Sequence, residues 1–478
     1  MSVIFTQIQF HAACSPAKPA IMLPDRVASY GMVASGMESV RSVLDGFRID
    51  RDKPVGVLIG NSARHIIVGL ALIKSGFTIA SLRRDLVRPA LDSGISTIIT
   101  DENLPPMEGL RTILADDFWF NDPRPKKIPA HAIAPDRVIR IAFTSGSTGR
   151  PKPIAHTHQA LIDRTNLAAM IGFGQGERVM STYGVSGPGF MQAVASLVSG
   201  RTVCFSPPEQ LLSSMLFCGA DGFRGSVGHL RTLLAAQEEF GRPLKLKQVS
   251  VGGAFMSFDM AEKVRASFGC EIINAYAAVE GGVIASASGG LLASHAVRGS
   301  CYAPLSDIRI CGDDGQELPM GSDGVIHVRS DRTSGYFNGA LDLAPDQACG
   351  RWVQTGDMGR IEEDGMLIVT GRADEVINMG GAKYDPEVIE GVLMQHPAIA
   401  SAAVLRMIGE DGGHAAWAFI PPSAGLSVES LNQWISTRAD AGLLSLDFAR
   451  LIEVDSIPKT ASGKVDRGAL RKLYSAPT

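Results

Sequence analysis

Strand-length apolar stretches alternate with helix-length stretches along the first part of the chain, and this alternation restricts the fold more than any other feature. The apolar stretch 54–60 is followed by an amphipathic run from Ser62 to Ser75. A second apolar strand is expected at Val138–Phe143, and a helical pattern runs from about His158 to Met170. Such alternation is typical of βαβ units, which build a largely parallel sheet with helices on its faces. We therefore expect an α/β fold.

The pattern changes over about 297–372, where short apolar runs are separated by Asp-Gly pairs. These pairs are Asp314-Gly315, Asp323-Gly324 and Asp364-Gly365. Asp and Gly tolerate the positive φ of a tight hairpin turn, so the pairs predict an antiparallel β subdomain. We expect it to complete a large N-terminal domain over 1–372, followed by a compact α+β domain over 373–478. The elements expected in the second domain are a helix at about 386–395, strands at 402–407 and 415–420, and a helix at about 427–438.

The composition excludes several classes of protein. Of the 478 residues 45% are hydrophobic, enough for a large core, so the chain is neither disordered nor fibrous. The net charge of −4 gives no electrostatic support for nucleic-acid binding. The apolar run from Ile66 to Ile73 is too short to span a bilayer. The seven cysteines include no C-x-x-C pair, which favours reduced thiols in a cytoplasmic protein without a membrane span.

A loop rich in glycine and hydroxyl residues follows the strand expected at Val138–Phe143. It reads Thr-Ser-Gly-Ser-Thr-Gly-Arg-Pro-Lys-Pro over 144–153. Glycine lets a ligand approach backbone N–H groups closely, hydroxyls donate to anionic oxygens, and Lys152 adds a cation. The Walker spacing is absent, and a flexible polar turn is the alternative. The residues expected to hold a polyphosphate are Thr144, Ser145, Gly146, Ser147, Thr148, Gly149 and Lys152.

This decapeptide resembles the phosphate-binding signature of the adenylate-forming superfamily, which contains acyl-CoA synthetases, peptide synthetase adenylation domains and firefly luciferase. Three further segments match in the same order, and the resemblance covers about residues 10–475. It implies a large N-terminal domain of βα subdomains with an antiparallel β subdomain, and a small mobile α+β C-terminal domain. It also implies that the chain binds ATP and Mg²⁺.

The segment 272–280 is similar to the superfamily's Y-G-x-T-E motif, which flanks adenine and ends in a Mg²⁺ ligand. The resemblance makes Glu280 that ligand, and a carboxylate is a suitable donor for Mg²⁺. The residues implied to border adenine here and in the similar Gly-Gly-Ala turn are Gly253, Ala254, Asn274, Ala275 and Tyr276. The chain departs from the motif at Ala277, which replaces Gly, and at Val279, which replaces Thr. The lost hydroxyl donor is expected to cost about 1–3 kcal/mol of ligand or transition-state interaction.

The segment 352–357 is similar to the W-x-x-T-G-D motif, whose Asp accepts hydrogen bonds from both ribose hydroxyls. Asp357 is that residue here, and a carboxylate suits a vicinal diol because it has several lone pairs. The next segment resembles G-R-x-D. It implies that Arg372 contacts the ribose or a phosphate, and that Asp374 is the hinge about which the C-terminal domain rotates.

Two C-terminal segments complete the resemblance. The segment 378–386 matches the loop that lines the thiol tunnel, so Gly381 is implied to allow close approach of pantetheine and Lys383 to contact a coenzyme A phosphate. The segment 458–467 matches P-K-T-x-S-G-K-x-x-R and makes Lys464 the lysine that enters the active site during adenylation. Its ammonium stabilises the charge that develops as a carboxylate attacks the α-phosphorus.

The expected activity is ATP-dependent conversion of a carboxylic acid to acyl-AMP, followed by thioester formation with coenzyme A. Lys464, Glu280 and Lys152 are the expected catalytic residues. The stretch 180–190, in the acyl-pocket region, contains no Asp to pair with a substrate ammonium, which favours an apolar acyl or aryl acid. One alternative is an enzyme that loads the phosphopantetheine of an acyl carrier protein. Another is a degenerate nucleotide-binding protein without turnover, because Val279, Asn378 and Val388 depart from the superfamily's usual residues. The oligomeric state stays open.

Overall fold

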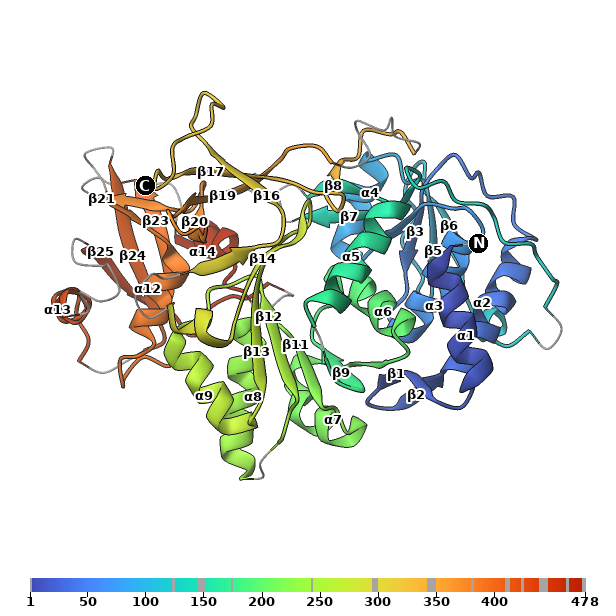
Figure 1. Cartoon of the computed structure of the whole chain (residues 1–478), viewed down its shortest axis with the longest axis horizontal. Helices are drawn as coiled ribbons and strands as arrows, with labels where there is room; N and C mark the ends of the chain where they lie inside the picture. The colour runs from blue at the N-terminus through green and yellow to red at the C-terminus, as the bar shows by residue number, and fades with distance from the viewer. Residues whose placement is uncertain are drawn as a thin grey trace.

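The computed structural model of the protein describes residues 2–122, 125–144, 151–172, 175–241, 244–294, 300–341, 350–379, 382–408, 413–422, 425–437, 446–460 and 464–474. It has a large N-terminal domain and a smaller C-terminal domain at the opposite end of an elongated molecule (Figure 1). Among the described residues, no helix combines the length and the apolar character needed to cross a bilayer.

The first sheet has seven strands and lies in the N-terminal part of the large domain (Figure 1). Its spatial order is β18 (Gly335–Tyr336), β8 (Lys152–Thr157), β7 (Val138–Thr144), β4 (Ile79–Ser81), β3 (Val55–Leu58), β5 (Thr97–Thr100) and β6 (Arg111–Leu114). Strands β7, β4, β3, β5 and β6 run parallel, whereas β8 pairs antiparallel with β7. The parallel α/β fold predicted from the alternating pattern is confirmed.

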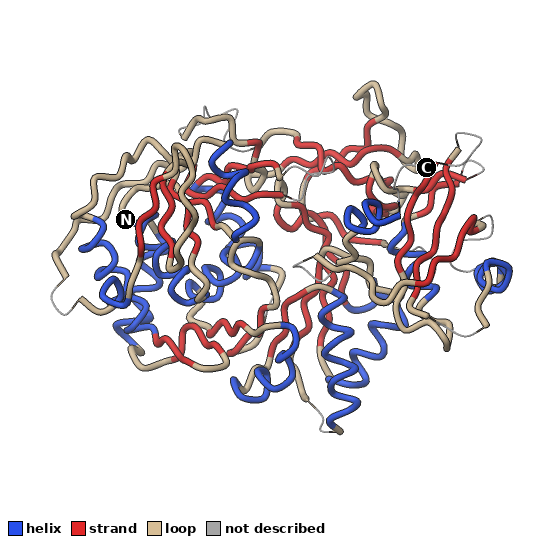
Figure 2. The backbone as a smooth tube through the Cα atoms, turned by 180° about the vertical axis from the view of Figure 1, so that it is seen from behind, coloured by secondary structure: helices blue, strands red, loops and turns tan. Residues whose placement is uncertain are grey.

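The second sheet has thirteen strands and continues from the large domain's centre toward the C-terminal domain (Figures 1 and 2). Its order is β16 (Asp307–Cys311), β17 (Gly324–Arg329), β19 (Val353–Ile361), β20 (Leu367–Arg372), β15 (Cys301–Pro304), β14 (Gly282–Ser288), β13 (Glu271–Ala278), β12 (Gln248–Gly252), β11 (Gly222–Gly225), β9 (Arg178–Ser181), β10 (Thr202–Phe205), β1 (Pro19–Leu23) and β2 (Arg26–Ser29). The strands from β1 to β13 in this order are parallel, and those from β14 to β16 are antiparallel. The antiparallel strands therefore extend the parallel sheet.

Two of the three Asp-Gly pairs form the predicted turns. Gly315 and Gly365 have φ angles of +76° and +79° between antiparallel strands. The third pair behaves differently, because Gly324 is already the first residue of β17 and the positive φ falls on Gly321 instead. A Cβ at Gly324 would lie 2.5 Å from the carbonyl oxygen of Cys311, so glycine is needed there for close strand approach.

The helices cover both sheets. Those of the large domain are α1 (Val3–Cys14), α2 (Tyr30–Leu44), α3 (Ser62–Lys74), α4 (Val87–Asp92), α5 (His158–Met170), α6 (Pro188–Val198), α7 (Leu211–Cys218), α8 (Val227–Phe240) and α9 (Phe258–Phe268). Helix α3 begins where the Asn61 side chain accepts a hydrogen bond from the backbone N–H of Arg64. It was predicted to be amphipathic, but it is buried on nearly every side because α2, β1, β3 and β4 all pack around it.

Burial of α3 includes His65, which is 0% exposed. Its Nδ1 lies 3.3 Å from the carbonyl oxygen of Ile59, and burial lowers its pKa from 6.5 to about 4. The His65 imidazole is therefore protonated below about pH 6.5 in the unfolded chain, but only below about pH 4 in the folded chain. As the pH falls from 6.5 to about 4, we therefore expect His65 to lower the free energy of unfolding by about 1.4 kcal/mol per pH unit. Urea denaturation between pH 7 and pH 4 should show a shallower pH dependence in His65→Leu, and an unchanged slope would contradict this assignment.

The C-terminal domain has its own sheet and its own apolar core. Strand β24 (His414–Ile420) pairs antiparallel with β23 (Ala403–Ile408) and parallel with β25 (Phe448–Glu453). The other elements are the strands β21 (Ile377–Met379) and β22 (Ala382–Tyr384) and the helices α12 (Pro386–Leu393), α13 (Val428–Ser436) and α14 (Arg467–Tyr474). Ile389, Val404 and Leu431 are among the buried residues of this core. The α+β composition predicted for this part is confirmed, with each predicted element within a few residues of its observed bounds.

Candidate active site

Three parts of the chain that are far apart in sequence meet at the carboxyl ends of the parallel strands of the large sheet. His156 on β8 has its Nε2 3.2 Å from the carbonyl oxygen of Val279, on the turn between β13 and β14. Lys464 of the C-terminal domain lies against Gly253, directly after β12. In parallel α/β sheets, ligands bind outside the carboxyl ends of the strands. We therefore take this meeting point as the candidate site.

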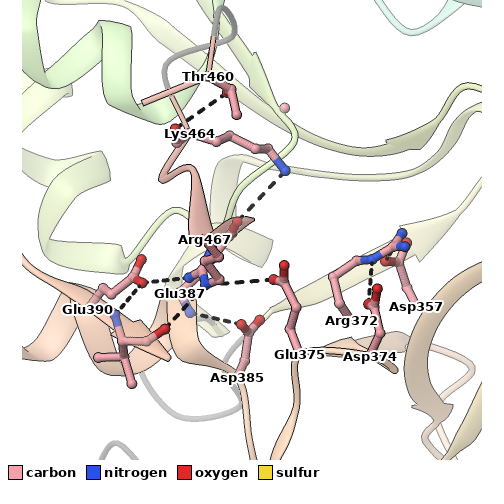
Figure 3. Close-up of polar contacts among 12 residues, drawn as sticks. Asp357, Arg372, Asp374, Glu375, Asp385, Glu387, Glu390, Thr460, Lys464 and Arg467 are labelled. Atoms are coloured by element: carbon pink, nitrogen blue, oxygen red, sulfur yellow. Dashed lines mark hydrogen bonds and ion pairs between the residues drawn. The ribbon is translucent and has the colours of Figure 1, made fainter. Parts of the chain in front are cut away.

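The approach of Lys464 depends on glycine at position 253. Gly253 has a φ of +82°, and a Cβ placed on it would lie 3.2 Å from Cε and 3.7 Å from Nζ of Lys464. Any other residue would be strained at this φ and would crowd the lysine. The Lys464 carbonyl oxygen accepts the backbone N–H of Thr460 at 2.8 Å, and its Nζ lies 3.7 Å from Oε1 of Glu387 (Figure 3). The lysine is thus held extended toward the large domain.

Asp357 is the centre of a polar cluster, and it lies within range of the charge of Lys464. Its Oδ2 accepts a hydrogen bond from the Tyr276 hydroxyl at 2.6 Å, and its Oδ1 accepts one from Arg372 at 3.2 Å (Figure 3 shows the arginine). Burial raises the pKa of Asp357, whereas the charges of Arg372 and Lys464 and the bond from Tyr276 act in the opposite direction. The Asp357 side chain is only 14% exposed.

Arg372 connects this cluster to the start of the C-terminal domain. Its backbone is the cross-strand partner of Asp357, and its Nε lies 3.4 Å from Oδ1 of Asp374 (Figure 3). Farther along, the buried Arg467 donates to Oε1 of Glu390 at 2.5 Å and lies 3.7 Å from Oε2 of Glu375. The predicted hinge Asp374 therefore lies between the polar cluster at Asp357 and the ion pairs that organise the C-terminal domain.

The residues predicted to border adenine do not all reach the cluster. Tyr276 and Gly253 do, through Asp357 and Lys464. Asn274 and Ala275 are 0% and 2% exposed within β13, and the Asn274 amide donates to the hydroxyl of Tyr302 at 3.3 Å. Successive residues of a strand point to opposite faces of the sheet, so these two side chains are buried on opposite faces of β13. Ala254, two residues beyond β12, packs against the core of the large domain.

The predicted phosphate loop is described only at its two ends. Thr144 and Lys152 are cross-strand partners in the β7–β8 hairpin, and Nζ of Lys152 lies 5.7 Å from the ring centroid of Tyr336. The predicted polyphosphate contacts that lie outside the described residues are Ser145, Gly146, Ser147, Thr148 and Gly149. In the thiol-tunnel segment Gly381 also lies outside the described residues, and the Lys383 backbone pairs with Asn378 in the β21–β22 hairpin.

Glu280 lies on the turn between β13 and β14, where the main chain is held by several donors. Its carbonyl oxygen accepts hydrogen bonds from the backbone N–H of Ser334 at 2.7 Å and from Arg164 at 3.0 Å. Burial raises the pKa of its carboxyl group, and Arg372 and Arg164 oppose that rise. Within the described residues, no group of three or more metal-ligating side chains is present. A single half-buried carboxylate fits Mg²⁺ that takes its other ligands from phosphate oxygens and water.

Two residues of the site had no signal in the sequence. Arg164 on α5 is one, because an isolated arginine in an otherwise ordinary helix matches no motif. Glu387 is the other, since no motif in the neighbouring sequence predicts its contact with Lys464.

Tyr183 in the acyl-pocket region donates its hydroxyl to the carbonyl oxygens of Gly225 at 2.7 Å and Gly252 at 3.1 Å. Its ring therefore lies across the carboxyl ends of β11 and β12.

Comparison with known proteins agrees with the motifs. Residues 8–337 match the family model described as AMP-binding enzyme, and residues 388–464 match the AMP-binding enzyme C-terminal domain. Indoleacetate–CoA ligase of Aromatoleum aromaticum is 26% identical over 511 residues, which cover 98% of both chains. A fatty acid–acyl-carrier-protein ligase of Streptomyces coeruleorubidus is 25% identical over 503 residues, covering 97% of this chain and 95% of the relative.

The fold is also shared with solved structures. The o-succinylbenzoate coenzyme A synthetase of Bacillus subtilis, solved in complex with ATP and magnesium, superposes with a TM-score of 0.80 at 21% identity, over 97% of this chain and 99% of that one. Since the family model matches well over half of its length, the chain belongs to the AMP-binding enzyme family, within the adenylate-forming superfamily of AMP-forming ligases.

Proposed function

We propose that the chain is an ATP- and Mg²⁺-dependent ligase that converts a carboxylic acid to acyl-AMP and then to a thioester of coenzyme A. The observation that carries this proposal is the position of Lys464, which reaches from the C-terminal domain to Gly253 beside Asp357. An ammonium at this position would stabilise the charge that develops as a carboxylate attacks the α-phosphorus more than it stabilises bound ATP.

In the first half-reaction, an oxygen of the substrate carboxylate attacks the α-phosphorus of ATP, and pyrophosphate leaves. Asp357 accepts hydrogen bonds from the ribose hydroxyls and thereby fixes the nucleotide. Lys464 donates to the oxygens on which charge accumulates, and Lys152 with the loop 144–149 holds the β- and γ-phosphates. Mg²⁺ bound to Glu280 would neutralise charge on the phosphates. Donors that are held in place beforehand stabilise developing charge without the cost of reorganisation.

In the second half-reaction, a thiolate attacks the acyl carbonyl carbon, and AMP leaves with the bonding electron pair. Activation is required because a free carboxylate has no leaving group of comparable quality. The C-terminal domain is proposed to rotate about Asp374 between the two steps, which withdraws Lys464 and brings the segment that contains Gly381 and Lys383 to the acyl-AMP. Closure in each state excludes water that would hydrolyse the adenylate.

The acid is proposed to be an apolar acyl or aryl acid. The stretch 180–190 offers no carboxylate to an ammonium group. The Tyr183 ring adds an aromatic surface whose hydroxyl is already engaged with two carbonyl oxygens. Both features favour an uncharged substrate body. The similarity to indoleacetate–CoA ligase is consistent with an aryl acid.

A carrier-protein phosphopantetheine is the second candidate acceptor, because the chain is as similar to a fatty acid–acyl-carrier-protein ligase as to CoA ligases. Both acceptors present the same terminal thiol. ATP–pyrophosphate exchange across a panel of acyl, aryl and amino acids tests the first half-reaction, and thioester assays with coenzyme A and with a holo-carrier identify the acceptor. We expect exchange with apolar or aryl acids and thioester formation with coenzyme A. ATP binding without exchange for any acid would instead support a degenerate binding protein.

A further inference from the structure

One guanidinium group lies directly behind the turn that carries Glu280. Arg164 on α5 donates through Nη2 to the carbonyl oxygens of Val279 and Glu280, each at 3.0 Å. The same side chain donates to the carbonyl oxygen of Arg332 through Nε at 3.0 Å and through Nη2 at 2.8 Å. It also reaches the Ser334 hydroxyl at 3.2 Å. This one side chain therefore hydrogen-bonds to two loops, the turn at Glu280 and the segment 332–334.

These two loops belong to different sheets. The turn at Glu280 joins β13 to β14 in the thirteen-stranded sheet, whereas the segment after Ser334 continues into β18, which pairs with β8 in the seven-stranded sheet. The Ser334 N–H completes the connection by donating to the Glu280 carbonyl oxygen at 2.7 Å. Arg164 thus connects the Glu280 turn to the sheet whose β7–β8 hairpin leads into the loop 145–150.

The backbone is shaped to admit this guanidinium. Gly282 has a φ of +69°, and a Cβ on it would lie 3.2 Å from Nε of Arg164. Among the described residues, the polar partners of the Arg164 guanidinium are carbonyl oxygens, one hydroxyl and His156. The guanidinium is half-buried, and removing a charge from water is costly, although the charge of Glu280 offsets part of that cost. Arginine here provides planar, multiple donors in one fixed geometry.

We propose that Arg164 is a positioning residue that sets the direction in which the Glu280 carboxylate meets a divalent cation. By fixing the carbonyl oxygens of the two peptide units that flank the Glu280 Cα, Arg164 limits the backbone angles from which the side chain projects. The inference rests on the proposed function, because it takes Mg²⁺–ATP as the ligand of the site. Residues that hold a metal ligand in place typically change metal affinity 10- to 100-fold when they are replaced.

The test measures binding of ATP by isothermal titration at a series of Mg²⁺ concentrations, without acid or thiol. For Arg164→Gln we expect the Mg²⁺ concentration that gives half of the full ATP affinity to rise by about 10-fold or more. For Arg164→Lys, which keeps the charge but loses the planar donors, we expect a smaller rise. Arg178→Gln is the matched control, because Arg178 also donates to a carbonyl oxygen, that of Cys218, away from the Glu280 turn. It should leave the Mg²⁺ dependence unchanged.

A double-mutant cycle separates positioning from folding. If Arg164 acts through Glu280, then adding Arg164→Gln to Glu280→Gln should change the Mg²⁺ dependence less than about 2-fold, although each single change is large. Additive effects, or a lower melting temperature with an unchanged Mg²⁺ dependence in both Arg164 variants, would overturn the proposal. A wild-type ATP affinity that does not respond to Mg²⁺ would overturn it too. Wild-type binding of Mg²⁺–ATP without pyrophosphate exchange would contradict only the proposed function.

Discussion

Replacing Lys464 by alanine is expected to lower the rate of acyl-AMP formation by about 100-fold or more, since removal of one preorganised donor to a developing charge typically has this effect. The ammonium lies beside Gly253, within range of the Asp357 carboxylate, where it can act on charge that develops at the α-phosphate. Pyrophosphate exchange with a reactive acid measures this step. ATP affinity should change much less, because the lysine is proposed to act on the transition state.

The second half-reaction provides the internal comparison for this variant. When synthetic acyl-AMP and coenzyme A are supplied, the Lys464→Ala variant should form thioester at nearly the wild-type rate, because Lys464 is proposed to be withdrawn in that step. Lys472→Ala on the exposed face of α14 removes another C-terminal lysine and should affect neither step. Equal losses in both half-reactions would show that Lys464 supports the fold or the hinge, and that it has no selective role in adenylation.

Replacing Asp357 by asparagine is expected to weaken ATP binding by about 100-fold. Two hydrogen bonds from the ribose hydroxyls to a charged acceptor contribute about 1.5 kcal/mol or more each, and about 1.4 kcal/mol corresponds to a factor of ten. Asparagine keeps the shape and still accepts a hydrogen bond from Tyr276, but it cannot pair with Arg372 as an ion. Equilibrium titration with ATP measures the change.

Deoxyribose nucleotides identify the origin of that loss. The wild-type chain should bind 2′-deoxy-ATP and 3′-deoxy-ATP more weakly than ATP, and the Asp357→Asn variant should discriminate far less between them. If the variant keeps the full discrimination, then Asp357 does not contact the ribose. Its effect would then come from the loss of the ion pair with Arg372.

The parts of the fold that follow from local pattern were predictable. The apolar run predicted β7, and the helical pattern predicted α5 at its observed bounds. Strand β8 was not predicted, because Lys152 and Pro153 were assigned to the loop and β8 forms by pairing with β7. Helix α3 was predicted in position but not in environment, because its complete burial depends on β1 and β4, which pair with strands distant in sequence. Likewise, the continuation of the parallel sheet into the antiparallel strands is a matter of strand pairing, which no local window contains.

The candidate site, like the fold, was predicted only in part from the sequence. Motif order predicted that Asp357, Arg372 and Lys464 belong together. Asp357 hydrogen-bonds to Arg372 and to Tyr276, and Lys464 lies against Gly253 within range of the Asp357 charge. The sequence does not reveal that Asn274 faces Tyr302 inside the sheet, since alternation alone does not say which side of β13 is covered. Nor does it reveal Arg164, whose importance arises only from the carbonyl oxygens that folding brings to it.

The most direct test of the central claim follows the α-phosphate of ATP in a single turnover without thiol. The chain is mixed with Mg²⁺, ATP labelled at the α-phosphorus and a reactive acid, then quenched and separated. The label is expected to appear in acyl-AMP only when acid is present, and Lys464→Ala is expected to slow its appearance by about 100-fold or more. Label recovered in ADP, or label that stays in ATP for every acid although ATP binds, would contradict the account.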